Sequence, residues 1–364
     1  MTGERYDNSM EVKDILCGLT GAYGVSGDEN CASAEAKKYL KKYTSNIKVD
    51  SFNNVIAHIG KHDKGKKTLL LDAHIDEIGM IVTYIDDDGF LKISNCGGID
   101  RRILLASQVK VHSSITGEQI VGIITSKPPH LKKGDEGKKA PEIDNISIDV
   151  GLSAERAREI ISLGDRVTIH SETRQMLNDR FCSKAMDDRA GVTAILWAIE
   201  LLSREYGGNL DEISLPFNVV VLFSSLEEVN IGGAKIASYK INADEALVVD
   251  VSFAHTFDAP EHKCGKMGDG AMIGIAPTLD RGLSDRLIKL GKDRNIPHQI
   301  EVMAGKTSTN ADAISISRDG VRACTVSIPL RYMHTPIETL QISDIESVST
   351  LIFEYIKGGI VNAE

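Results

Sequence analysis

The segment 182–191, which reads Cys-Ser-Lys-Ala-Met-Asp-Asp-Arg-Ala-Gly, places two adjacent acidic residues directly before a predicted helix. Apolar residues recur at helical spacing up to Leu202, so we expect this helix to begin near Arg189. Acidic residues are favoured at a helix N-terminus, and Asp187 and Asp188 could therefore serve only as a cap. Other acids and histidines near predicted strand ends favour a ligand set for a two-metal hydrolase instead: His74, Asp76, Glu227, Glu228, Asp250 and His334.

Helices and strands alternate in the first and last parts of the chain, which indicates an α/β core with three layers, α/β/α. Residues 68–75 form a near-continuous apolar run, as buried strands do. Ser26 and Glu29 are expected to form a capping box at the start of a helix that runs to about residue 43. Further strands are predicted at 47–50, 55–59, 218–224, 246–251, 272–275, 299–301 and 323–328, and helices at 189–206, 233–241, 284–294, 311–317 and 343–357.

The pattern changes between residues 78 and 170, where short alternating strands dominate. They are predicted at 80–85, 90–94, 108–112, 120–124 and 166–169, with one short helix near 153–161. We interpret this segment as a small β-barrel-like domain inserted into the α/β core. The expected domains are a catalytic domain at 1–76 and 172–364 and an inserted oligomerisation domain at 77–171.

Composition excludes several classes of function. The formal net charge of −10 argues against a nucleic-acid partner, which would require clustered Lys and Arg. Four lysines do cluster in a predicted solvated loop, but Asp135 and Glu136 interrupt them; they are Lys132, Lys133, Lys138 and Lys139. No apolar run approaches the roughly 20 residues needed to cross a membrane, and the N-terminus does not resemble a signal peptide. Six widely spaced cysteines favour reduced thiols, so we expect a cytoplasmic protein.

The candidate ligands have complementary positions. His74 and Asp76 are two residues apart on an extended segment and share one face, so Asp76 could accept the imidazole N–H that faces away from a metal. An isolated histidine of this kind would more simply be a hydrogen-bonded core residue. Glu227 and Glu228 are expected in a loop, where neighbours point in different directions and one can bind metal while the other acts as base. Asp250 ends a buried strand, where an unpaired acid would be costly.

At these residues the chain resembles the tetrahedral (TET-type) di-metal aminopeptidases, also labelled glutamyl aminopeptidase, cellulase M or endoglucanase. The resemblance runs nearly end to end and rests on six ordered motifs. They are Gly-Val-Ser-Gly at 24–27, Ala-His-Ile-Asp-Glu at 73–77, Lys-Ala-Met-Asp-Asp-Arg at 184–189, Glu-Glu-Val at 227–229, Val-Asp-Val at 249–251 and Arg-Tyr-Met-His-Thr-Pro at 331–336.

The resemblance implies a phosphorylase/hydrolase-like catalytic core with a PDZ-like insertion, and two divalent metal ions per subunit. Zinc or cobalt is expected, with manganese as the alternative. His74 and Asp250 would hold one ion, Glu228 and His334 the other, and Asp187 would bridge them, with a cis peptide bond after it. The expected reaction removes N-terminal residues from peptides: a water shared by the ions attacks the scissile carbonyl, and Glu227 is its general base. Asp76 would orient His74, and dimers would assemble into a homododecamer.

Two departures from the family pattern bear on rate and substrate preference. The segment after Glu228 reads Val-Asn-Ile-Gly-Gly, with Asn230 and Gly232 in place of the usual Gly and Arg, and Asn310 replaces a usual Asp. Neither departure removes a predicted ligand, so we expect metal binding to survive. Two alternatives stay open: a glycoside hydrolase, which needs two flanking carboxylates and no metal, and a metal-binding homologue with weak catalysis.

Overall fold

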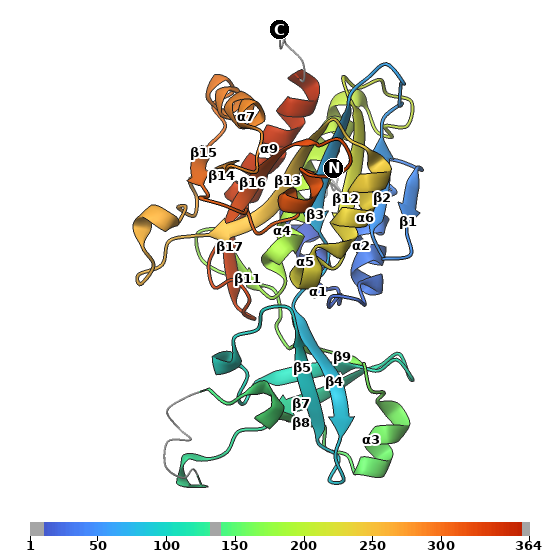
Figure 1. Ribbon diagram of the computed structural model, residues 1–364, viewed down its shortest axis with the longest axis vertical. Coiled ribbons are helices and arrows are strands. Elements are labelled where there is room, and N and C mark those ends of the chain that lie inside the picture. Colours follow the sequence, from blue (N-terminus) through green and yellow to red (C-terminus); the bar gives the residue numbers. More distant parts are fainter. Residues whose placement is uncertain (1–10, 132–139, 359–364) are drawn as a thin grey trace, which may run out of the picture.

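The computed structural model describes residues 11–131 and 140–358; the loop with Lys132, Lys133, Lys138 and Lys139 lies outside these ranges. Within them the chain forms a mixed eight-stranded sheet and, beside it, a closed barrel (Figure 1). In order of neighbours, the sheet strands are β1 (Ile47–Val49), β2 (Val55–Ile59), β12 (Asn218–Ser224), β3 (Thr68–His74), β13 (Glu245–Phe253), β16 (Arg322–Leu330), β14 (Ala271–Ile275) and β15 (His298–Val302). The central strands β12, β3, β13 and β16 are parallel, whereas β2 and β14 pair antiparallel on either side of them.

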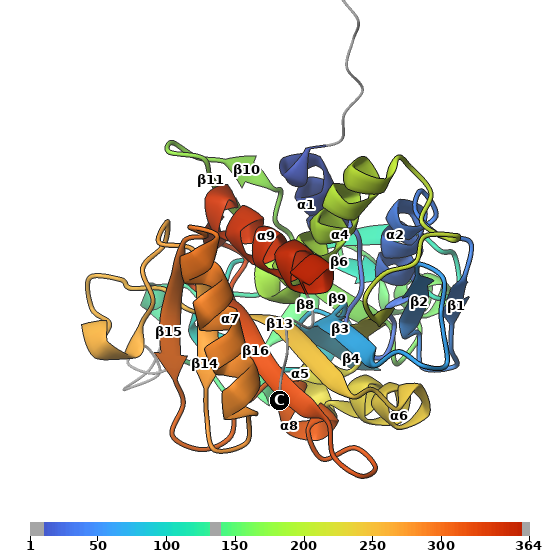
Figure 2. The same ribbon diagram turned by 90° about the horizontal axis from the view of Figure 1, so that it is seen from above.

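Helices cover both faces of the sheet, which confirms the predicted three-layer α/β/α core (Figure 2). One face carries α1 (Val12–Gly21), α2 (Asn30–Leu40), α4 (Met186–Tyr206), α7 (Arg281–Asp293) and α9 (Ile342–Gly358), and the other carries α6 (Gly232–Ile241) and α8 (Ala311–Ile314). Successive strand residues point to opposite faces, so Leu71 packs in the first helical layer and Leu70 in the second. Burial on both faces explains why the central strands are almost entirely apolar.

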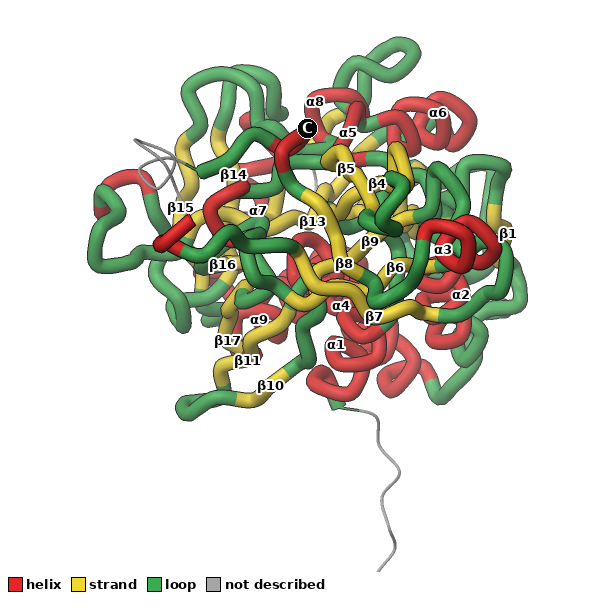
Figure 3. The backbone as a smooth tube through the Cα atoms, turned by 90° about the horizontal axis from the view of Figure 1, so that it is seen from below, coloured by secondary structure: helices red, strands yellow, loops and turns green. Residues whose placement is uncertain are grey.

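The inserted barrel is also present, below the sheet in Figure 1 and nearest the viewer in Figure 3. Its strands, in order around the barrel, are β4 (Gly79–Ile85), β5 (Leu91–Cys96), β8 (Ser147–Asp149), β7 (Gln119–Ile124), β6 (Gln108–His112) and β9 (Arg166–Ile169), all antiparallel. The barrel has its own apolar core, which includes Met80, Val109 and Ile148. The helix α3 (Ala154–Ile160) begins after Ser153, whose side chain accepts from the backbone N–H of Arg156. The domain boundaries at 76/77 and 171/172 stay a prediction.

A second, smaller sheet was not predicted. It contains β10 (Arg174–Gln175), β11 (Arg180–Ser183) and β17 (Glu338–Gln341), which pair antiparallel. Strands of two to four residues carry almost no periodic signal, so sequence patterns rarely reveal them. Short 3₁₀ turns complete the fold: η1 (Arg101–Ile103), η2 (Pro129–Leu131), η3 (Ile143–Asn145) and η4 (Glu261–Lys263).

The predicted capping box at Ser26 and Glu29 is wrong. Glu29 accepts from the backbone N–H of Gly27, but the Ser26 hydroxyl donates to Asp76 instead, at 2.6 Å. Ser26 therefore contributes to the site described below rather than to a helix end. All six cysteines are free thiols. None of the helices in the described ranges combines the length and apolar character needed to cross a bilayer.

Candidate metal centre

The carboxyl ends of the four parallel strands bring the predicted ligands to one edge of the sheet, on the side of the barrel. His74 is the last residue of β3, Asp250 lies in β13, and His334 follows β16. Glu228 follows β12, and Asp187 lies at the start of α4, which packs on β3 and β13. Ligands of open α/β sheets gather at such carboxyl ends because the loops there converge.

The side chains of the other four residues converge on Asp187. One carboxylate oxygen of Asp187, Oδ1, lies 3.0 Å from His74 Nε2, and the other, Oδ2, lies 3.4 Å from His334 Nε2. Glu228 Oε2 also lies 3.4 Å from His334 Nε2. Two sets of ligand atoms, each within 4.8 Å of one another, could hold a metal ion: His74, Asp187 and Asp250, and Asp187, Glu228 and His334. Asp187 belongs to both sets.

The donor chemistry fits divalent metals. Imidazole nitrogens and carboxylate oxygens together suit zinc and the neighbouring transition metals. Glu228 Oε1 is buried and has no hydrogen-bond partner among the described residues. A buried carboxylate oxygen without a partner is costly, and a cation beside it would remove that cost.

Backbone geometry and a buried glutamate set the position of Asp187. The peptide bond between Asp187 and Asp188 is cis, as the resemblance implied, and Ala185 has a left-handed φ of 55°. Glu338 on β17 accepts from the backbone N–H of Asp187 at 3.2 Å and from that of His334 at 2.8 Å. Glu338 thus links two predicted ligands that are far apart in the sequence. Sequence reasoning missed it, because it stands in an unpredicted strand and its partner Asp187 is 151 residues away in the sequence.

Asp76 does more than orient His74. The Asp76 carboxylate lies 3.5 Å from His74 Nδ1, and the backbone carbonyl oxygen of Asp76 lies 3.2 Å from the same nitrogen. The carboxylate also accepts from the backbone N–H groups of Glu227 and Glu228, at 3.0 and 3.2 Å. These two residues begin a one-turn helix, α5 (Glu227–Asn230), so the expected loop at this point was wrong. Asp76 stabilises the turn because it satisfies N–H groups that a helix start leaves free.

Charge is concentrated in a buried space. Burial raises the pKa of Glu227 to about 7; the carboxylates of Glu228 and Asp187 add to the rise, and His74 opposes it. Burial likewise raises the pKa of Asp250 well above its ordinary value. Burial alone would also raise the pKa of Asp187, but hydrogen bonds from His334 and His74 hold it below its usual range. The site therefore has more carboxylates than its histidines can neutralise, and added positive charge would stabilise it.

Glu227 differs from its neighbour Glu228. It belongs to neither ligand set, although it is largely buried beside them. Glu228 supplies a ligand atom to one set, whereas Glu227 supplies none. The division of roles between the two glutamates stays a prediction.

The family departures touch no ligand. Asn310 is buried and donates through Nδ2 to Asp72 at 2.9 Å and to Ser224 Oγ at 2.7 Å, so it joins α8 to β3 and β12. Asn230 is exposed at the end of α5, and a Cβ added to Gly232 would come within 2.5 Å of the Asn230 side-chain oxygen.

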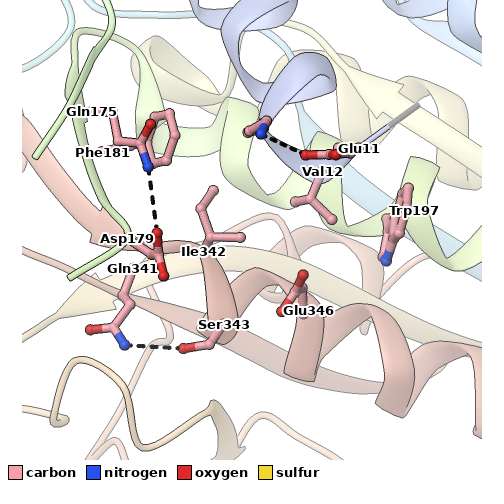
Figure 4. Close-up of a pocket in the computed structure, with 11 residues that line it drawn as sticks. Glu11, Val12, Gln175, Asp179, Phe181, Trp197, Gln341, Ile342, Ser343 and Glu346 are labelled. Carbon is pink, nitrogen blue, oxygen red and sulfur yellow. Dashed lines mark hydrogen bonds and ion pairs between the residues drawn. The ribbon is translucent and has the colours of Figure 1, made fainter. Parts of the chain in front are cut away.

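Two cavities differ in their relation to the cluster. A small one of about 20 Å³ adjoins Asp187 and Glu228 and is lined by Lys184, Glu77 and apolar barrel residues such as Ile99. A larger one of about 360 Å³ lies between the start of α1, the β10–β11 hairpin and the start of α9 (Figure 4). None of the predicted ligands lines the larger cavity, so we do not assign it to the metal centre.

The α/β/α core and the ligand cluster at its carboxyl edge define a metal-dependent hydrolase. The model of the M42 glutamyl aminopeptidase family matches residues 53–351. The chain therefore belongs to this family, and it is a metalloaminopeptidase.

Individual relatives agree with the family match. The lysyl aminopeptidase of Pyrococcus furiosus is 29% identical, over 90% of this chain and 92% of its own length. An aminopeptidase structure from the archaeon Desulfurococcus kamchatkensis has a TM-score of 0.86 and 31% identity, covering 95% of this chain and 94% of the other. The TET1 peptidase of Pyrococcus horikoshii, which can assemble into a tetrahedron or a large octahedral shell, has a TM-score of 0.82 and 29% identity, covering 95% and 99%. A structure of PhTET1-12s holds a dodecamer in its asymmetric unit.

Proposed function

We propose that the chain is a two-metal aminopeptidase that removes N-terminal residues from peptides. His74 and Asp250 would hold one ion, Glu228 and His334 would hold the other, and Asp187 would contribute to both sites. The observation that carries this proposal is the position of Asp187, whose two oxygens face different histidines at 3.0 and 3.4 Å. When bound, the metals would lower the pKa of a water, polarise the scissile carbonyl and hold the free α-amine.

The residues of the chain then divide the remaining work. Glu227 accepts the proton of the attacking water and delivers it to the leaving amine, a role that suits a carboxylate which lies beside the ligand sets and belongs to neither. Asp76 holds the backbone of Glu227 and Glu228 and faces His74 Nδ1. Glu338 holds the backbone of Asp187 and His334, and these contacts keep the ligands in place.

We further propose zinc or cobalt as the metal, with manganese as an alternative, because mixed imidazole and carboxylate ligands accept all three. The TET1 relatives support a homododecamer for this chain as well. Six free thiols favour a reducing compartment such as the cytoplasm.

The test compares leucyl-p-nitroanilide with its N-acetylated form, before and after chelation. Hydrolysis of the free amine only, lost with a chelator and restored by metal, would support the proposal. Equal cleavage of the acetylated substrate would contradict the amine-binding role. Chelator-resistant hydrolysis of a soluble glucan would instead favour a glycosidase, and a fully metal-loaded protein without turnover would favour a binding homologue.

A further inference from the structure

Glu301 on β15 has an unusual environment for a carboxylate. It is half-buried, and its two oxygens accept from the hydroxyls of Ser252 on β13 and Ser327 on β16, the second at 3.0 Å. Glu301 faces Gly274 across the β14–β15 pair, and glycine has no side chain to separate it from β16. The carboxylate therefore reaches across the sheet to β13, which carries Asp250, and to β16, which His334 follows.

Sheet register places these hydroxyls beside the metal centre. Ser327 is the direct partner of Asp250 between β16 and β13, so the two residues lie on the same face and about 4.8 Å apart. Ser252 is two residues beyond Asp250 on the same strand, so its side chain points to that face too. Glu301 thus lies on the Asp250 side of the centre. Its carboxylate accepts from Ser327, and Ser327 is the direct neighbour of Asp250.

Within residues 11–131 and 140–358, Glu301 forms no ion pair; burial raises the pKa of its carboxyl, and hydrogen bonds from Ser252 and Ser327 oppose this rise. Two other buried glutamates do have a cationic partner: Glu245 lies 2.9 Å from Arg286, and Glu77 lies 2.7 Å from Lys184. The buried Glu338 has none, but it accepts from two backbone N–H groups, which Glu301 does not. A hydroxyl satisfies only one lone pair of each Glu301 oxygen, and every carboxylate oxygen can accept twice. Glu301 consequently keeps acceptor capacity for a positively charged group that the protein itself does not supply.

We propose that Glu301 binds the cationic end of a lysine or arginine side chain at the N-terminus of the substrate. This inference rests on the proposed function, which holds the α-amine and the scissile carbonyl at the metals. A lysine side chain then extends away from the centre on a four-carbon stem with an ammonium group at its tip. On the Asp250 side this group meets Glu301, whereas an N-terminal glutamate would meet a like charge. The enzyme accordingly prefers basic N-terminal residues.

The test uses lysyl- and norleucyl-p-nitroanilide, because norleucine keeps the stem and lacks the ammonium group. We expect wild-type kcat/KM to be about 10-fold to 100-fold higher for the lysyl substrate, the range of a charge-assisted hydrogen bond. Glu301→Gln should bring the two values within about threefold, while Glu301→Asp keeps the charge and most of the preference. Glu172→Gln, an exposed glutamate outside the proposed site, is the matched control and should keep the full ratio.

Equal wild-type values, or a ratio that Glu301→Gln leaves unchanged, would overturn the proposal. A purely structural role for Glu301 predicts lower thermal stability of the variant with no change in the ratio. If no p-nitroanilide is hydrolysed after metal addition, the proposed function fails. Calorimetric binding of L-lysine amide and L-norleucine amide would then decide on Glu301 separately: a lysine preference lost in Glu301→Gln supports the site, and its absence overturns it.

Discussion

At the residue scale, two of the buried carboxylates hold other groups rather than a metal. Asp76 and Glu338 accept backbone N–H groups from residues on either side of the cluster. A buried carboxylate is tolerated when such donors surround it. The contacts explain how a one-turn helix and a loop after β16 can carry ligands with a defined geometry.

Glu338→Gln should therefore weaken metal binding without removing a ligand. Its amide nitrogen would face a backbone N–H that needs an acceptor, so Asp187 or His334 loses support. Loss of such a supporting contact costs about 10-fold to 100-fold in metal affinity. Metal titration of the chelated protein measures this, and excess metal should restore turnover. Unchanged affinity in the variant, beside an unchanged Glu172→Gln control, would contradict the role of Glu338.

At the element scale, the long elements were predictable and the short ones were not. The apolar run at 68–75 and the periodic helix after Arg189 both carry a signal over many residues. The helix α5 and the strand β17 have four residues each, and contacts distant in sequence stabilise them. Prediction of the site is limited in the same way. The candidate ligands near strand ends could be named from the sequence, whereas the contacts of Glu338 and the Ser26–Asp76 hydrogen bond form only in the folded protein.

The junction between barrel and core contains a histidine that should make stability depend on pH. His112 on β6 stacks on Tyr23 from the α1–α2 connection, with ring centroids 3.6 Å apart, and burial lowers the pKa of His112 to about 4. Between pH 6.5 and 4 the unfolded chain binds a proton that the folded chain does not, so the free energy of unfolding falls as pH falls. His112→Phe keeps a stacked ring that cannot bind a proton. Between pH 7 and pH 5 the free energy of unfolding of this variant should fall by about 1–2 kcal/mol less than that of the wild type.

Urea unfolding at the two pH values measures this difference: His112→Phe reports the pH response of all other groups, and the wild-type protein adds that of His112. The exposed His262 provides the control, since His262→Phe should follow the wild type. If His112→Phe loses as much stability as the wild type over this pH range, the junction histidine does not have the assigned role.

At the scale of the whole molecule, the barrel presents apolar residues to solvent in the single chain. Val121 and Ile123 on β7 are 65% and 53% exposed. Exposed apolar residues that lie close together indicate a contact with another chain. We expect the barrel, at about 77–171, to provide much of the interface of the proposed homododecamer.

Light scattering tests the assembly. Twelve chains of 39.6 kDa would give a particle of about 475 kDa, since 12 × 39.6 is 475. The double substitution Val121→Asp and Ile123→Asp should give smaller particles, because it would bury charge in a contact between chains. A wild-type mass of one chain would contradict assembly, and an unchanged mass in the double variant would move the interface away from β7.

The most direct test of the two-metal account compares Glu227→Gln with Glu228→Gln. Metal content by mass spectrometry and kcat on one good substrate are measured for both. Glu227→Gln is predicted to keep both metals and to lose about 10²–10⁴-fold in kcat, the usual contribution of a placed general base. Glu228→Gln is predicted to lose one metal and to recover part of its activity in excess metal. If Glu227→Gln loses a metal, or Glu228→Gln keeps both and is inactive, the two roles are assigned the wrong way round.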